Sequence, residues 1–215
     1  MKHGVDYAAP AGANTLRTLK LGGNSFVCRY VSTPGNPKNI SPVEASACKE
    51  LGVKIVLVFE TTANRALDGE DAGRFDARSA QRQAQTTGVW GRFRKPIIYF
   101  AVDFDSTPKE WPVIHSYLKG AQTVLKGRAG VYGGYWTVKR ALDSKVVRFA
   151  WQTYAWSGGA WDPRAQLHQY ANGKSVAGLS VDLDRAVHFD YGQWPRPLIP
   201  RPKPHKHSWL PWGKI

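Results

Sequence analysis

Short apolar runs bounded by glycine, proline or polar residues recur eight times along the chain, and predicted helical stretches separate the second to the sixth of them. Such runs predict buried strands, and apolar residues at helical spacing predict helices between them. The predicted strands span residues 4–8, 25–31, 54–60, 96–105, 129–135, 149–154, 166–170 and 180–184. The predicted helices span residues 41–52, 71–88, 109–126 and about 136–142. The connections between the last three strands are too short or too rich in glycine for full helices.

This alternation predicts an α/β fold, a single (β/α)8 TIM-like barrel with degenerate late helices; an open doubly wound sheet is the alternative. No glycine-rich phosphate loop follows an early strand, because Gly22 and Gly23 precede the second strand without a GxGxxG pattern. Polar residues also recur at the strand ends, and in a barrel these ends meet at one mouth. They are Asp6, Arg29, Glu60, Asp103, Asp105, Tyr132, Gln152, Gln169 and Asp182. Both observations favour the barrel.

The fourth predicted strand ends on two acids, Asp103 and Asp105. Side chains alternate along a strand, so both carboxyls are expected on one face, roughly 6–7 Å apart at the backbone. Carboxyl pairs with different pKa values are what acid/base and glycosidic chemistry require. The alternative is helix capping, although Ser106 or Thr107 can serve as that cap.

Length and composition indicate one folded domain, because 215 residues with 42% hydrophobic and 12% aromatic residues support one sizeable core. We place the barrel at residues 1–194 and a proline-rich basic tail at 195–215. No apolar run approaches the roughly 20 residues of a membrane span, and the first residues lack the apolar core of a signal peptide. We therefore expect a monomer that is neither inserted in a membrane nor secreted by the classical route. Cys28 and Cys48 are expected as buried thiols.

The net charge of +14 suits a polyanionic partner: nucleic acid, anionic lipid or the acidic polymers of a bacterial wall. The tail contributes part of this charge without any acid, and its alternating prolines favour an extended, polyproline-like chain. Its cations are Arg196, Arg201, Lys203, Lys206 and Lys214, and Trp209 and Trp212 lie near its end. The acids expected at the barrel mouth argue against nucleic acid, because they would repel phosphates there.

Four motifs in order carry a resemblance to a known family. They are Gly4-Val-Asp6, Val102-Asp-Phe-Asp105, His168-Gln-Tyr170 and Val181-Asp-Leu-Asp184. They resemble glycoside hydrolase family 25, the Chalaropsis-type lysozymes, and still more the glycoside-hydrolase-like barrel domains of actinobacteria and their phages. The resemblance covers residues 2–194. It implies a modified barrel whose mouth cleaves the bond between N-acetylmuramic acid and N-acetylglucosamine in peptidoglycan, as in a phage endolysin, which stays in the host cytoplasm until it is released to the wall.

The resemblance also implies catalytic roles. Asp105 stands where the family 25 lysozymes carry the general-acid Glu, one methylene longer, and Asp103 matches the first acid of that motif. Asp6 and Asp182 match acids of the first and last strands; with Asp103 they would stabilise the oxocarbenium-like transition state. Because a misplacement of about 1 Å can cost on the order of 100-fold in rate, the shorter acid leaves a second hypothesis. In that hypothesis the protein is a catalytically weak barrel that binds wall glycan.

The remaining candidates are polar and aromatic residues near the predicted mouth that could bind substrate. They are Glu60, Arg29, Tyr132, Tyr135, Trp136, Trp151, Trp156, Gln152, Gln169 and Tyr170. Glu60 and Arg29 could instead form a salt bridge, and core packing is the alternative role of each aromatic ring. His168 and His188 have no triad or metal spacing and are interpreted as structural. The acids could hold Mg²⁺ or Ca²⁺, but no calcium-loop pattern is present, so we predict neither metal nor cofactor.

Overall fold

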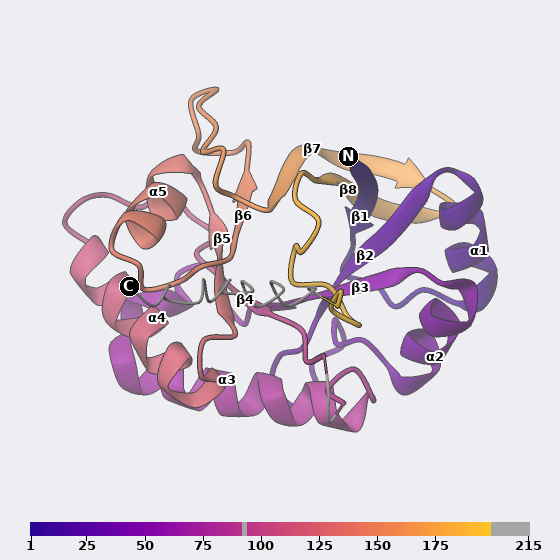
Figure 1. The fold of residues 1–215 in the computed structure, drawn as a ribbon, viewed down its shortest axis with the longest axis horizontal. Helices are drawn as coiled ribbons and strands as arrows, with labels where there is room; N and C mark the ends of the chain where they lie inside the picture. The colour runs from indigo at the N-terminus through magenta and orange to yellow at the C-terminus, as the bar shows by residue number, and fades with distance from the viewer. Residues whose placement is uncertain (92–93, 199–215) are drawn as a thin grey trace, which may run out of the picture.

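The structure, a computed structural model, describes residues 1–91 and 94–198. Eight strands, five α-helices and one 3₁₀ helix follow one another along this part of the chain (Figure 1). Their bounds are β1 (Lys2–Asp6), α1 (Ala13–Leu21), β2 (Asn24–Tyr30), α2 (Pro42–Leu51), β3 (Lys54–Phe59), η1 (Arg65–Asp68), α3 (Gly69–Thr86), β4 (Ile98–Ala101), α4 (Trp111–Leu125), β5 (Ala129–Gly133), α5 (Tyr135–Asp143), β6 (Ala150–Thr153), β7 (Leu167–Val176) and β8 (Leu179–Ala186). The helix α1 lies where no helix was predicted.

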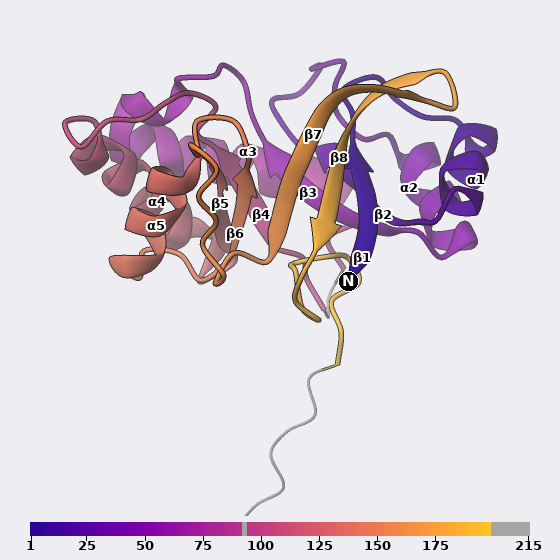
Figure 2. The same cartoon turned by 90° about the horizontal axis from the view of Figure 1, so that it is seen from above.

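The strands close into one barrel in the order β1 to β8, which confirms the predicted TIM-like barrel. Neighbouring strands from β1 to β7 are parallel, whereas β8 is antiparallel to both β7 and β1. Figure 2 shows β7 and β8 side by side as a long hairpin. The parallel strands end at one rim of the barrel, and the antiparallel β8 begins there. We call this rim the mouth.

The reversal of β8 has a local cause in a two-residue hairpin turn. Val176 pairs with Leu179, and the two residues between them, Ala177 and Gly178, have φ angles of 54° and 79°. Positive φ at both central positions is the type I′ geometry that joins antiparallel strands with the correct twist. The eighth strand therefore lacks the crossover helix of a regular (β/α)8 barrel.

Packed side chains fill the barrel below the mouth. Phe26, Tyr99 and Trp151 are part of this interior cluster, with Tyr191 beneath them. Gly4 makes room for Phe26, because a Cβ on Gly4 would lie 2.5 Å from the ring. The hydroxyl of Tyr99 donates a hydrogen bond to the Tyr191 carbonyl at 2.9 Å. The segment after β8 thus packs against the end of the barrel opposite the mouth.

Both cysteines are buried free thiols, as expected. No helix within residues 1–91 and 94–198 is long and apolar enough to cross a membrane. The predicted tail lies outside the described residues from 199 onward. Before that point Arg196 still contacts the body of the protein through an ion pair with Asp190.

Candidate active site

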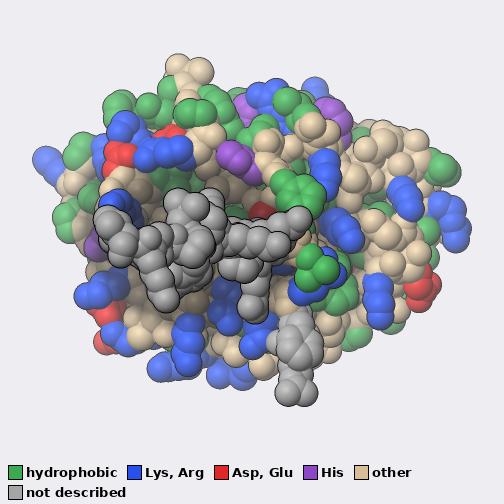
Figure 3. Space-filling view, viewed as in Figure 1, with side chains coloured by type: hydrophobic (Ala, Val, Ile, Leu, Met, Phe, Trp, Pro, Cys, Tyr) green, Lys and Arg blue, Asp and Glu red, His purple; other side chains and the backbone are tan. Residues whose placement is uncertain are grey.

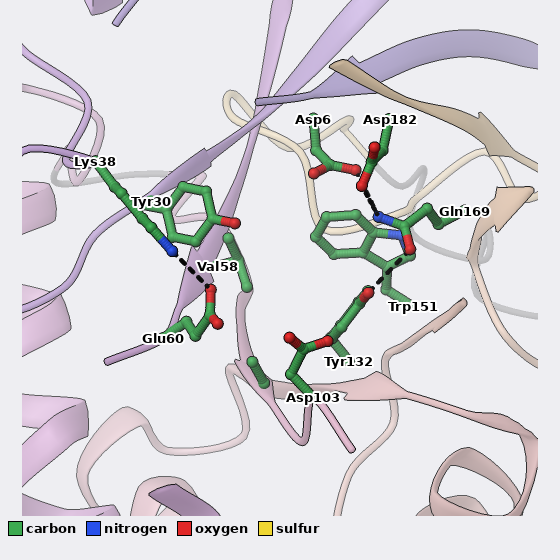
Figure 4. Close-up of a pocket in the computed structure, with 11 residues that line it drawn as sticks. Asp6, Tyr30, Lys38, Val58, Glu60, Asp103, Tyr132, Trp151, Gln169 and Asp182 are labelled. Atoms are coloured by element: carbon green, nitrogen blue, oxygen red, sulfur yellow. Dashed lines mark hydrogen bonds and ion pairs between the residues drawn. The ribbon is translucent and has the colours of Figure 1, made fainter. Parts of the chain in front are cut away.

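A polar pocket of about 190 Å³ opens at the mouth of the barrel (Figure 4). Residues from all eight strands, and from the loops after β2, β3 and β4, form its wall. They are Asp6, Tyr30, Lys38, Val58, Glu60, Ala101, Asp103, Tyr132, Trp151, Gln169 and Asp182. Seven of the predicted site residues are in this set: Asp6, Glu60, Asp103, Tyr132, Trp151, Gln169 and Asp182.

One wall of the pocket is a carboxylate pair bridged by an amide. Asp6, at the end of β1, lies opposite Asp182 in the β1–β8 ladder, so both side chains reach the mouth from adjacent strands. The Nε2 atom of Gln169 donates to Asp6 at 2.8 Å and to Asp182 at 3.2 Å. The hydroxyl of Tyr132 donates to Oε1 of the same amide at 2.9 Å. Because the amide oxygen already accepts from Tyr132, its NH₂ group faces the two carboxyls.

A bulge in β7 supplies a further donor to this wall. The register between β7 and β8 shifts on either side of Ala171, and Gly173 adopts a φ of 62°. The Gly173 N–H group donates to Oδ1 of Asp182 at 2.9 Å. Such bulges re-aim groups at barrel rims, and this one fixes the Asp182 carboxylate toward the pocket.

Asp103 and Glu60 belong to the opposite side of the pocket (Figure 4). Asp103 follows β4, and its N–H group donates to the Ala63 carbonyl at 3.1 Å. The Glu60 carboxylate pairs with the ammonium of Lys38 at 3.6 Å, and that ammonium lies 5.0 Å from the centre of the Tyr30 ring. No hydrogen bond to the Asp103 carboxyl is found within the described residues, so this group is free to meet a ligand.

The pocket makes two of its acids, Asp6 and Asp103, easier to protonate. Burial, and then the charge of Asp182, raises the pKa of Asp6 from 3.8 to about 6. Burial and the charge of Glu60 also raise the pKa of Asp103, against the opposing effect of Lys38. Figure 3 shows Lys and Arg side chains spread widely over one face of the molecule. Among the described residues that line the pocket, Lys38 is the one Lys or Arg.

Asp105 is not in the pocket, contrary to the prediction that it shares a face with Asp103. The strand β4 ends at Ala101, and the N–H group of Asp103 turns away to Ala63, so strand alternation no longer applies to these residues. The exposed Asp105 lines a separate small hollow with Trp136 and Trp156. Of the four acids expected to converge, the structure brings together Asp6, Asp103 and Asp182 and leaves Asp105 outside.

Arg29 also lies away from the pocket, so its prediction as a mouth residue is wrong. Its neighbour Cys28 faces the barrel interior, which turns Arg29 toward the helices. The buried guanidinium pairs with Glu44 of α2 at 2.8 Å. The predicted Arg29–Glu60 salt bridge is absent, and Glu60 pairs with Lys38 instead.

Strand alternation likewise turns Gln152 and Tyr170 away from the pocket. Gln152 is fully buried and holds the loop after β6, donating to the Ala160 carbonyl at 2.7 Å. Tyr170 is exposed on the outer side of β7, with the Arg185 guanidinium 5.7 Å from its ring centre. Both were predicted to bind substrate, and neither lines the pocket.

The other predicted aromatic residues lie at the start of α5 and in the loop after β6. Trp136 is 53% exposed, and its ring packs edge-on against Tyr135 at 5.1 Å. Trp156 lines the hollow that contains Asp105. Neither histidine lines the pocket: His168 accepts a hydrogen bond from Arg185 at 3.0 Å, and His188 contacts the Pro163 carbonyl.

Sequence reasoning missed three polar residues of the site. Tyr30 and Lys38 line the pocket, and Asp184 is fully buried on the strand that carries Asp182. Asp184 could have been found by the i, i+2 rule that singled out Asp103 and Asp105, whereas Lys38 lies in a loop and gave no signal. Within the described part of the chain, no three His, Cys, Asp or Glu side chains form a group that could hold a metal ion.

Comparisons with known proteins show the family and the fold of the chain. Residues 17–188 match the family described as Rv2525c-like, glycoside hydrolase-like domain. The crystal structure of the Mycobacterium tuberculosis Tat-secreted protein Rv2525c, in complex with L-tartrate, is similar with a TM-score of 0.80 and 28% identity. The match covers 90% of this chain and 98% of that one. A search of curated proteins gives no match.

Two lysozyme-type structures share the fold at lower identity. The catalytic domain of the endolysin ply40, from bacteriophage P40 of Listeria monocytogenes, has a TM-score of 0.52 and 14% identity, over 86% of this chain and 93% of that one. The Streptococcus pneumoniae autolysin LytC, in complex with a synthetic peptidoglycan ligand, has a TM-score of 0.58 and 12% identity, over 85% of this chain and 46% of that one. The predicted resemblance to glycoside-hydrolase-like barrels is confirmed. The chain belongs to the Rv2525c-like family of glycoside hydrolase-like domains.

Proposed function

We propose that this protein is a glycosidase that cleaves bacterial cell-wall peptidoglycan between N-acetylmuramic acid and N-acetylglucosamine. The observation that carries the proposal is the convergence of Asp6, Asp103 and Asp182 in one pocket, two of them with raised pKa values. Carboxyls in different protonation states around one sugar are the requirement of glycoside hydrolysis. Structural neighbours that act on or bind wall glycan support the choice of substrate.

In the proposed reaction, Asp103 is the proton donor. Its carboxyl borders the pocket, is free of hydrogen bonds within the described residues, and is kept easier to protonate by burial and by Glu60. It would give its proton to the glycosidic oxygen as the bond to the anomeric carbon breaks. This assignment replaces the predicted role of Asp105, which lies in the neighbouring hollow.

Asp6 and Asp182 form the negative wall that would face the positive charge of the transition state. The Gln169 amide and the Gly173 N–H group already donate to these carboxyls. Donors fixed before substrate arrives hold the carboxylates in place during the reaction, which is the general basis of electrostatic catalysis. Tyr30 and Tyr132 add aromatic walls at which a sugar ring can pack.

A second candidate is a barrel that binds wall glycan without cleaving it. The position of Asp105 favours this alternative, because the residue at the general-acid position of the family 25 motif is exposed outside the pocket. The two candidates share the ligand and differ only in whether Asp103 delivers a proton.

Digestion of purified peptidoglycan, followed by mass spectrometry of the soluble fragments, separates the two candidates. The glycosidase predicts new reducing N-acetylmuramic acid ends with the wild type and none above background with Asp103→Asn. Sedimentation with the wall and no new ends for either protein would support the glycan-binding alternative. We also propose that the basic tail strengthens binding to the wall by charge attraction. Sedimentation with cell walls at low and high salt, with a variant truncated from about Pro197 onward, tests this.

A further inference from the structure

Asp184 is a buried acid beneath the pocket that the proposed reaction does not use. Its side chain is fully buried, and it lies on the same face of β8 as Asp182. In the β1–β8 ladder Asp184 pairs with Gly4 and Asp182 pairs with Asp6. Asp6 and Asp184 are therefore diagonal neighbours on the interior face of the barrel.

The two oxygens of the Asp184 carboxyl have different surroundings. The indole Nε1 of Trp151 donates to Oδ1 at 2.9 Å. Oδ2 is buried and receives no hydrogen bond from an N–H or hydroxyl donor of the described residues. The carboxyl of Asp6 is its diagonal neighbour in the β1–β8 ladder, and two carboxyls can share a hydrogen bond only when one of them carries a proton.

The surroundings of Asp6 and Asp184 decide which of these two carboxyls carries the proton. The titratable groups that influence this pair are acids, thiols or phenols: Cys28 and Tyr30 on β2, Glu60 after β3, Tyr132 on β5 and Asp182 on β8. The nearby Arg29 faces the helices and is paired with Glu44. Asp6 borders the pocket and accepts from Gln169, whereas Asp184 has no contact with solvent. Burial and the charge of Asp6 raise the pKa of Asp184 far above its ordinary range.

We propose that Asp184 is a permanently neutral carboxylic acid that donates its proton to Asp6 and accepts from Trp151, and thereby positions both groups at the floor of the pocket. A neutral donor stabilises the Asp6 carboxylate without adding a charge to a site that already holds several acids. In the proposed glycosidase, on which only this catalytic meaning depends, the Asp184 donor favours the ionised form of Asp6, the carboxylate that would face the transition state. Asp184 is thus a positioning residue for Asp6.

Titration of Asp6 in the full-length protein tests the inference without any substrate. Carboxyl carbon resonances can be followed by NMR between pH 3 and 9, with Asp6 identified from its loss in Asp6→Asn. In Asp184→Asn the amide can still donate to Asp6 and accept from Trp151, so the Asp6 midpoint should stay near the wild-type value of about 6. If Asp184 were ionised in the wild type, the same variant would remove a negative neighbour and the midpoint would fall. That fall would overturn the proposal.

Asp182→Asn is the matched control on the same strand. The charge of Asp182 raises the pKa of Asp6, so its removal should lower the Asp6 midpoint.

Asp184→Ala removes the neutral donor and should raise the Asp6 midpoint by about one pH unit, the usual scale for one hydrogen bond to a charged group. The indole N–H resonance that is lost in Trp151→Phe should also shift in Asp184→Ala and hold its position in Asp184→Asn. Asp184→Asn decides the question even where Asp184→Ala does not fold. Absence of glycan cleavage by the wild type would leave all these titrations unaffected, so the two proposals can fail separately.

Discussion

Two groups of buried acids in this protein are treated in opposite ways. In the helix layer, Glu44 pairs with Arg29 at 2.8 Å and also accepts from the Tyr7 hydroxyl at 2.9 Å. Asp76 is held in a similar way by Arg65 at 2.7 Å. At the mouth, Asp6, Asp182 and the buried Asp184 share amide, indole and backbone donors but no cation.

The acids of the helix layer stabilise the fold through their arginine partners, whereas the acids at the mouth are a cost that the rest of the fold must offset. A buried carboxylate that is paired with an arginine is compensated, and breaking such a pair leaves an uncompensated charge. A buried carboxylate among other acids is costly when ionised, and its pKa rises. The chain has 30 Lys and Arg residues, so it does not lack cations that could pair with Asp6. No such ion pair to Asp6 is found in the described residues, and uncompensated buried acids of this kind are typical of functional sites.

Removal of the helix-layer charge should have the largest effect on stability. Glu44→Gln leaves the Arg29 guanidinium buried without its counter-ion, so the free energy of unfolding should fall by about 3–5 kcal/mol. Urea denaturation followed by far-UV circular dichroism measures this change. A loss below about 1 kcal/mol would show that the carbonyls around Arg29 already compensate its charge.

The matched change at the mouth should have the opposite sign. The pKa of Asp6 is raised from 3.8 to about 6, so between these pH values the folded protein binds more protons than the unfolded chain. Stability contributed by protonated Asp6 is therefore lost as the pH rises toward about 6 and stays lost above it. Asp6→Asn should stabilise the protein at pH 7 by at most about 3 kcal/mol, from about 1.4 kcal/mol for each pKa unit, and by little at pH 4. A stabilisation that is equal at both pH values would contradict the assignment.

The smallest effect is expected at the one ion pair of the pocket. Lys38 is 43% exposed and lies 3.6 Å from Glu60, so Lys38→Gln should change stability by less than about 1 kcal/mol. Lys38 also lowers the pKa of Asp103, so the substitution should raise that pKa. Protonated Asp103 would then persist to higher pH, and the alkaline limb of the pH–rate profile should move upward. An unchanged or lowered alkaline limb would argue against Asp103 as the proton donor.

Periodicity carried most of the fold prediction and failed where strands end. Eight apolar runs predicted the eight strands of the barrel, and strand-end polarity located Asp6, Asp103 and Asp182 at the mouth. Asp182 lies at the mouth for a different reason from the one that the sequence suggested. The strand β8 is antiparallel, so the beginning of this strand, rather than its end, lies at that rim.

The errors have two physical causes. Asp105 was placed by extending strand alternation beyond Ala101, where the backbone has already left the sheet. Arg29 and Gln152 are true strand residues on the outer face, and strand-end polarity alone does not distinguish the two faces. The phase of each strand, fixed here by Cys28 and Trp151 in the interior, was the missing information.

Parallel rates of peptidoglycan cleavage by the wild type, Asp103→Asn and Asp105→Asn test the central claim most directly. Both substitutions remove one carboxyl of the same loop, one inside the pocket and one outside it. We predict that Asp103→Asn lowers the release of new reducing ends by roughly 100- to 10,000-fold, the usual contribution of a general acid, while Asp105→Asn stays within about threefold of the wild type. Loss of activity in Asp105→Asn with activity retained in Asp103→Asn would contradict this account and return the proton donor to Asp105.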